Sequence, residues 1–109
     1  MSISLAWLFL LIAACLDVVW AISMKNAEGY TRLGWSLLSL VALAAFVWLL
    51  GRSLSVLPVG TAYAVWTGLG AVGTLAAGAL FFGEIITLLR AGSILLILIG
   101  VAGLKFSTT

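Results

Sequence analysis

The chain is 109 residues long, with 65% hydrophobic and only 7% charged residues and a formal net charge of +2. Soluble domains carry about 25% charged residues, and a domain this small cannot bury so much apolar surface, so the composition argues against a soluble protein. The five Lys and Arg residues form no cluster that would bind nucleic acid, and a single cysteine excludes an internal disulfide.

Four apolar segments follow one another along the chain, at about residues 3–24, 33–50, 58–82 and 88–106. Each is close to the roughly 20 apolar residues that a membrane-spanning helix needs. They are apolar all round, without the alternation of a barrel strand. The sequence therefore predicts an all-α membrane protein, a single four-helix transmembrane domain over residues 1–109.

Short polar stretches separate these segments. The longest covers residues 25–32, and Gly51-Arg52-Ser53 is expected to begin the second connection. Pro58 stands where the third helix is expected to start, because proline is favoured in a first helical turn. Gly83 and Glu84 end the third segment. No polar stretch is long enough to form a domain outside the membrane.

Asp17 lies inside the first segment, with apolar residues on both sides. A charge at such depth costs about 2.5–3.5 kcal/mol on insertion scales, and an intramembrane acid is by default a functional group. No Lys or Arg lies in the interior of a span to neutralise it, so the alternative is a carboxyl group hydrogen-bonded for packing. A carboxylate can hold either a proton or a cation, and this exclusivity is enough to couple two fluxes. We therefore expect Asp17 to bind protons and a cationic substrate.

Helix periodicity indicates which side chains surround Asp17. Positions three and four residues away share its helix face, and aromatic residues at the same spacing occur in the third segment. Aromatic rings beside a carboxylate suit an organic cation, which gains cation–π attraction as well as ionic attraction. Packing, or a place in the interfacial aromatic belt, is the alternative for each tryptophan. The candidate lining residues on this argument are Ala14, Trp20, Trp48, Tyr63 and Trp66.

Small residues mark the third and fourth segments. Residues 68–73 match the dinucleotide fingerprint GxGxxG, but they lie in an apolar helix with no preceding strand, so we reject a nucleotide site. We expect Gly68, Gly70 and Gly73 to form a bendable point instead. Ser93 and Gly100 are seven residues apart in the fourth segment. Small residues let helices approach closely in lipid, so these two predict a dimer interface.

The distribution of basic residues gives almost no orientation signal. With four spans, Arg52 and Lys105 lie on one side, and Lys25, Arg32 and Arg90 on the other. Orientation follows the Lys and Arg excess, which is nearly balanced here. The chain therefore has either one weakly biased topology or a dual topology, in which copies insert both ways and pair antiparallel.

Three stretches resemble the small multidrug resistance family: Asp-Val-Val-Trp-Ala-Ile-Ser-Met-Lys at 17–25, Gly-Tyr-Thr-Arg-Leu at 29–33, and Leu-Pro-Val-Gly-Thr-Ala-Tyr-Ala-Val-Trp-Thr-Gly at 57–68. The similarity covers nearly the whole chain and is greatest to the guanidinium-exporter subtype. It implies an antiparallel homodimer, or a paired heterodimer, in a bacterial-type inner membrane. Such a dimer exchanges protons for cationic substrates by alternating access, without a cofactor.

The resemblance also implies roles for single residues. It puts Asp17 where the family has its proton- and substrate-binding carboxylate, and Trp20, Tyr63 and Trp66 at lining positions. The chain departs from the family by having Asp in place of Glu at this site. The guanidinium subtype has a small hydroxyl residue where Phe46 stands and a glycine where Ala14 stands, and Trp48 is similar to the aromatic residue of the quaternary-ammonium subtype. These departures concern the pocket wall and hence the substrate.

The sequence therefore leaves three functions open. The first is a proton-coupled exporter of guanidinyl compounds, and the second is the same mechanism with bulkier aromatic or quaternary ammonium cations. In either case the chain could be one half of a heterodimer. The third is a membrane assembly subunit that does not transport. An enzyme is not expected, because His is absent and the chain has no nucleophile–base set and no cluster of metal ligands.

Overall fold

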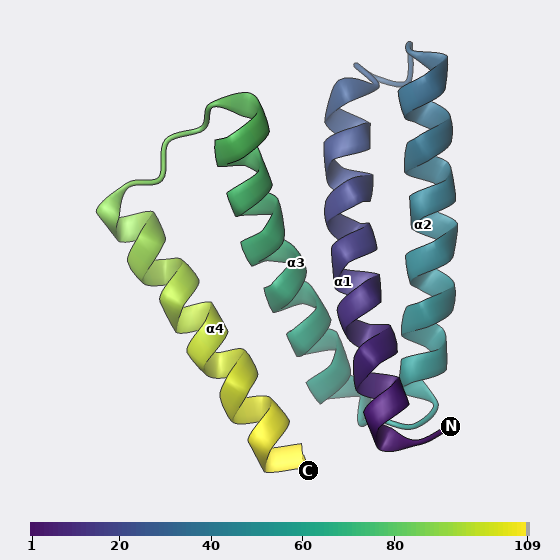
Figure 1. The fold of residues 1–109 in the computed structure, drawn as a ribbon, viewed down its shortest axis with the longest axis vertical. Helices are drawn as coiled ribbons and strands as arrows, with labels where there is room; N and C mark the ends of the chain where they lie inside the picture. Colours follow the sequence, from purple (N-terminus) through teal and green to yellow (C-terminus); the bar gives the residue numbers. More distant parts are fainter. Residues whose placement is uncertain (109) are drawn as a thin grey trace.

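The computed structural model describes residues 1–108, and within them it contains four long helices and no strand. They are α1 (Ile3–Asn26), α2 (Leu33–Leu54), α3 (Val59–Phe82) and α4 (Leu88–Thr108). Each is long and apolar enough to cross a membrane. The helices run alternately up and down, so both ends of the chain lie at the same end of the bundle (Figure 1). The expectation of an all-α protein with four spans is confirmed.

The helix ends follow local chemistry. The hydroxyl of Ser2 caps α1 by accepting a hydrogen bond from the Leu5 N–H at 3.1 Å. Pro58 is the N-cap of α3 and stands just before the first helical residue, where its fixed backbone angle costs nothing. Gly83 ends α3 in the left-handed region, at a φ of 67°, which glycine adopts without a steric penalty.

The end of α2 differs from the expectation. Gly51-Arg52-Ser53 does not begin a connection, because α2 continues to Leu54. The reason lies in Ser53, which is fully buried and donates a hydrogen bond from its hydroxyl to the backbone carbonyl oxygen of Ala6, at 2.9 Å. This bond satisfies the hydroxyl inside the bundle, so a polar residue can continue the helix there.

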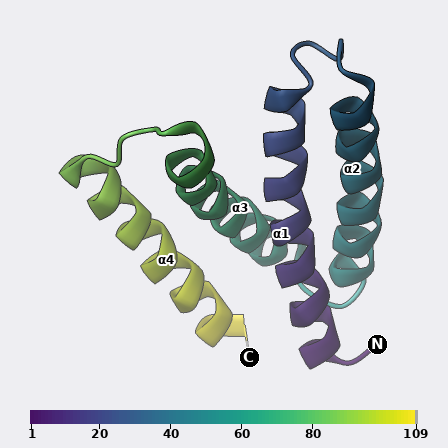
Figure 2. The ribbon, with the colours of Figure 1, turned by 45° about the horizontal axis from the view of Figure 1, so that its top comes forward.

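The packing order places α1 at the centre of the bundle. It packs against α2 along one side and against α3 along the other, whereas α4 packs against α3. Figures 1 and 2 both show α4 at the edge of the molecule, beside α3. No residue of α4 whose side chain the structure describes is buried, so this helix offers a large apolar surface to lipid or to a second chain.

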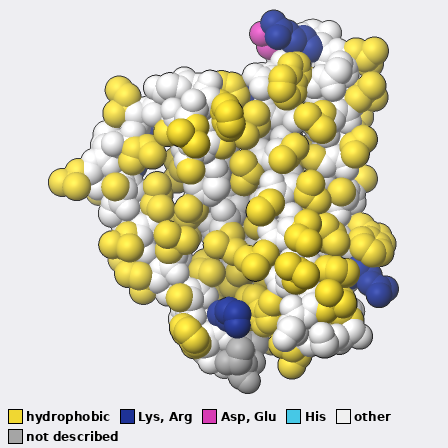
Figure 3. Space-filling model, in the orientation of Figure 1, with side chains coloured by type: hydrophobic (Ala, Val, Ile, Leu, Met, Phe, Trp, Pro, Cys, Tyr) yellow, Lys and Arg dark blue, Asp and Glu magenta, His cyan; other side chains and the backbone are white. Residues whose placement is uncertain are grey.

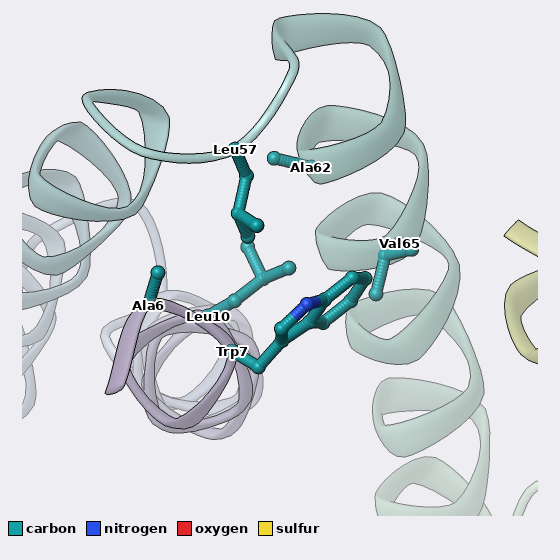
Figure 4. Close-up of a cluster of buried hydrophobic side chains, with 6 residues drawn as sticks. All are labelled: Ala6, Trp7, Leu10, Leu57, Ala62 and Val65. Atoms are coloured by element: carbon teal, nitrogen blue, oxygen red, sulfur yellow. The ribbon is translucent and has the colours of Figure 1, made fainter. Parts of the chain in front are cut away.

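The main buried cluster lies at the end of the bundle that holds the N-terminus (Figure 4). The indole of Trp7, on α1, lies beside Val65 of α3. Leu10, also on α1, points toward Leu57, which belongs to the loop between α2 and α3. This cluster fixes α1 against α3 at one end. Its members are Ala6, Trp7, Leu10, Leu57, Ala62 and Val65.

The outer surface is that of a protein surrounded by lipid. Figure 3 shows hydrophobic side chains over most of the visible face, with the Lys and Arg side chains toward its two ends. Arg52 lies 5.7 Å from the ring of Trp48, and the amino group of Lys105 lies 5.2 Å from the ring of Trp7. Tryptophan and basic side chains of this kind are typical of the boundary between hydrocarbon and headgroups.

Candidate functional site

The structure places Asp17 at the contact between α1 and α3. Its side chain is half-buried and lies against the backbone of Gly70, so closely that a Cβ atom at position 70 would overlap the carboxylate oxygen Oδ2. Glycine at this position is therefore what lets the two helices meet at the acid. Among residues 1–108, no hydrogen bond or ion pair engages the Asp17 carboxylate. It is an acid within the span that the rest of the chain leaves available.

Four of the predicted lining residues form a continuous row of aromatic rings, which we call the aromatic row: Trp20, Phe46, Trp66 and Tyr63. Adjacent ring centroids in this row are each 5.5 Å apart, within the range of favourable aromatic pairs. The row runs from α1 through α2 to α3. Phe46 occupies its middle and is only 3% exposed. Phe46, which departs from the family pattern, is therefore an interior residue of the bundle and does not face lipid.

The aromatic row lies close to Asp17 along both helices. Trp20 is three residues from Asp17 on α1, and Trp66 is four residues from Gly70 on α3, so each is about one turn away. The indole N–H of Trp66 is buried and has no acceptor among the described residues. An N–H group donates and cannot accept, so it complements a carboxylate and not a cation.

Trp48 is not part of this row. It is 60% exposed, and its ring lies 6.2 Å from that of Phe9 and 5.7 Å from the Arg52 guanidinium. Phe46 and Trp48 are two residues apart on a helix, which turns about 100° per residue, so their side chains point in different directions. In a single chain, Trp48 and Asp17 thus lie in separate surroundings.

Ala14 and Tyr63 lie beside two open grooves. Ala14 is 4% exposed and borders a groove of about 410 Å³ between α1 and α3. Tyr63 is 56% exposed and borders a groove of about 470 Å³ between α3 and α4. Both grooves are mainly apolar, and Asp17 lines neither of them. One copy of the chain therefore assembles the acid and the aromatic row without enclosing them in a pocket.

The three glycines expected to form a hinge lie in an unbroken helix in this structure. Gly70 and Gly73 face α1, where a Cβ atom at position 73 would come within 2.7 Å of a Val18 methyl carbon. Gly68 faces α4, where a Cβ atom would lie 3.0 Å from a Val101 methyl carbon. Their visible role is close approach between helices, and bending at this point stays a prediction.

The residues expected at a dimer interface are exposed on α4. The Ser93 hydroxyl donates a hydrogen bond to the Leu89 carbonyl oxygen at 2.9 Å, which removes the need for another partner. Gly100 has open space where a Cβ atom would stand, and it borders the groove between α3 and α4. Both residues are accessible to a second chain, and their use as an interface stays a prediction.

An ion pair that sequence reasoning missed joins α1 to the end of α3. The Lys25 amino group lies 3.8 Å from a Glu84 carboxylate oxygen and 4.8 Å from the centroid of the Phe82 ring. The two residues are far apart in the sequence. The signal that could have found them is that the first and third connections of a four-span protein share a side, with Lys25 at the first and Glu84 at the third.

Within residues 1–108 there is no group of three or more His, Cys, Asp or Glu side chains that could hold a metal ion. The other charged pair at this end, Arg32 and Glu28, is a local i,i+4 contact of 3.2 Å between exposed side chains.

Comparison with known proteins gives one consistent result. The family model described as "Small Multidrug Resistance protein" matches residues 5–106. The chain is 50% identical over 104 residues to a protein of Yersinia pseudotuberculosis serotype I (strain IP32953) named "Guanidinium exporter", covering 95% of this chain and 100% of the relative. Proteins with the same name from Salmonella typhimurium and Escherichia coli (strain K12) are 47% and 44% identical over 104 residues, covering 95% of this chain and 99% of each relative.

Proposed function

The chain belongs to the small multidrug resistance family and is a multi-pass transporter of the inner membrane, and we propose that it exports small organic cations, guanidinyl compounds above all, in exchange for protons. The observation that carries this proposal is the Asp17 carboxylate inside the span, next to the aromatic row and without a basic partner among the described residues. Relatives named "Guanidinium exporter", at 44–50% identity, support the substrate class.

The mechanism we propose is competition for one carboxyl group. A cation binds the ionised Asp17 from the cytoplasmic side, and a proton replaces it after the protein has opened to the other side. Because the group holds either the proton or the cation, each export step is matched by proton entry. In an antiparallel homodimer two Asp17 carboxyls would share the site, so their protonation would be coupled.

The aromatic row indicates which organic cations the site prefers. Flat guanidinium groups stack on indole and phenyl rings, and such contacts are worth about 2 kcal/mol or more when desolvated. Phe46 contributes apolar surface between Trp20 and Trp66 and has no hydrogen-bonding group. This favours cations with hydrophobic substituents over bare guanidinium. The same observation supports the second candidate, a quaternary ammonium exporter.

The test is transport by the purified protein in liposomes under an imposed pH gradient. Guanidinium, phenylguanidine and a tetraalkylammonium ion are compared side by side, and we expect the two guanidinyl compounds to be concentrated against their gradients. Transport of the tetraalkylammonium ion alone would favour the second candidate. If none of the three cations releases protons when it is added to the purified protein, the result would favour a subunit that does not transport.

Phe46→Ser is expected to shift the preference toward unsubstituted guanidinium. The change removes apolar surface and introduces a hydroxyl, so guanidinium gains relative to phenylguanidine by about tenfold if one stacking contact of about 1.4 kcal/mol is lost. The measurement is the ratio of transport rates for the two compounds. Phe9→Ser is the control, because Phe9 contacts Trp48 outside the aromatic row. A ratio that does not change in Phe46→Ser would remove Phe46 from the substrate path.

Dual topology is expected when this chain is expressed alone. Three Lys or Arg residues on one side oppose two on the other, which leaves almost no orienting bias. Reporters fused to the C-terminus should give signal from both sides of the membrane, in support of an antiparallel homodimer that uses the surface around Ser93 and Gly100. Signal from one side only would indicate a fixed orientation and a separate partner subunit.

A further inference from the structure

The contact between α1 and α3 continues from Asp17 to one end of the bundle. On α1, the residues Asp17, Ala21 and Lys25 are spaced by four and lie along one face. On α3, Gly70, Thr74 and Gly78 have the same spacing. Gly70 meets Asp17, whereas Thr74 and Gly78 border a cavity together with Ala21 and Lys25. We call this line of facing residues the α1–α3 seam.

A small cavity lies in the seam, about one turn beyond Asp17. Its volume is about 70 Å³, and its walls include the side chain of Thr74. The Thr74 hydroxyl makes no hydrogen bond with any other described residue, although it lies within the span and is half-buried. A polar cavity of more than about 15 Å³ can hold water. At about 70 Å³ it accommodates water molecules and is far smaller than the grooves of more than 400 Å³ on the lipid-facing surface.

A charged pair lies at the end of this cavity away from Asp17. Lys25 and Glu84 both line it, and their charged groups are 3.8 Å apart. The ring of Phe82 also lines the cavity, and its centroid lies 4.8 Å from the Lys25 amino group. The Glu84 side chain lies against Gly78, and a Cβ atom at position 78 would overlap its carboxylate oxygen Oε1. The left-handed Gly83 turns the chain so that the Glu84 N–H donates to the Gly78 carbonyl oxygen at 3.2 Å.

We propose that the α1–α3 seam is the water path by which protons reach Asp17 from this end of the bundle, and that the Lys25–Glu84 pair is the gate that closes it. The inference rests on the proposed exchange of protons at Asp17. Thr74 supplies the one hydroxyl that faces the cavity between the acid and the gate. The gate is formed by side chains that are about half exposed, so it is weak enough to open and close during transport.

The test measures water access to position 74 and needs no transport. In a Cys15→Ala background, Thr74→Cys is labelled in liposomes, from both sides, with an impermeant sulfonate-bearing thiol reagent. Glu84→Gln and Lys25→Gln are each expected to raise the labelling rate by about two- to fivefold, the range that loss of an exposed ion pair allows. The two substitutions change the local charge in opposite directions, so a common increase cannot come from attraction of the anionic reagent. The charge-swapped pair Lys25→Glu with Glu84→Lys should restore slow labelling.

Two further variants make the result decisive. Gly78→Ala displaces Glu84 without changing any charge and should also raise labelling, whereas Gly60→Ala, on the same helix with open space around it, should not. Arg32→Gln breaks the other pair at this end and should leave labelling unchanged. Unaltered labelling in both single variants, or no recovery in the charge-swapped pair, would overturn the gate. If cation transport fails in liposomes but labelling follows this pattern, the proposed function is wrong, and what stands is a gated water path with no role in proton exchange.

Discussion

Asp17→Asn is expected to abolish pH-driven cation transport while leaving the protein folded. Asparagine has nearly the shape of aspartate but cannot release a proton, so competition between proton and cation ends. The fold should tolerate the change, because no described residue forms a hydrogen bond or ion pair with the Asp17 carboxylate. Removing a charge from the span also lowers its insertion cost. The measurement is uptake into liposomes under a pH gradient, with size-exclusion chromatography as the test of folding.

Two matched variants separate charge chemistry from general damage. Glu28→Gln makes the same carboxyl-to-amide change at an exposed residue, whose pair with Arg32 contributes about 0–1 kcal/mol, so transport should be kept. Asp17→Glu keeps an ionisable group and should retain coupling to protons, at a lower rate because the longer side chain moves the carboxyl group. Accumulation of substrate by Asp17→Asn at the wild-type rate would contradict the mechanism proposed for this site.

The fold could be predicted because lipid reduces the choices. A chain this apolar must satisfy its backbone within the segment, which leaves helices, and four apolar segments then give four spans. The end of α2 could not be predicted in this way. The polar stretch around Ser53 predicts a loop, but the Ser53 hydroxyl donates a hydrogen bond to the carbonyl oxygen of Ala6, which is distant in the sequence. Only the packing of α1 on α2 shows that a buried serine continues the helix.

Sequence spacing predicts which site residues share a face of one helix, but not which residues meet between helices. Spacing from Asp17 puts Trp20 one turn away on α1, and in the structure the Trp20 ring packs against Phe46, which in turn packs against Trp66. The same periodicity shows that Phe46 and Trp48 cannot both point the same way, and the structure separates them. The Lys25–Glu84 pair depends on how α1 meets α3, which no local pattern encodes.

Gly70 was expected to bend α3, and in the structure it lies against Asp17. Its place in a run of glycines predicted a bend, whereas the structure shows α3 unbroken and the glycine backbone against the Asp17 carboxylate. A methyl group there would overlap Oδ2. Because the overlapping atom ends a short side chain that can rotate, the acid should move aside before the helices separate. Gly70→Ala should therefore misplace the acid and leave the bundle assembled.

The expected result is a loss of transport out of proportion to any loss of stability. Misplacing a reacting group by about 1 Å costs roughly a hundredfold in rate where geometry decides, so Gly70→Ala should transport between ten and a hundred times more slowly. Gly60→Ala is the matched control, because it lies on the same helix and a Cβ atom there meets nothing within 4 Å. Initial transport rates and thermal unfolding of both variants decide the question. If Gly70→Ala unfolds much earlier than Gly60→Ala, the glycine serves packing; if it transports at the wild-type rate, Asp17 does not need this close approach. A slow but stable Gly70→Ala would show that the glycine acts by positioning the carboxyl group.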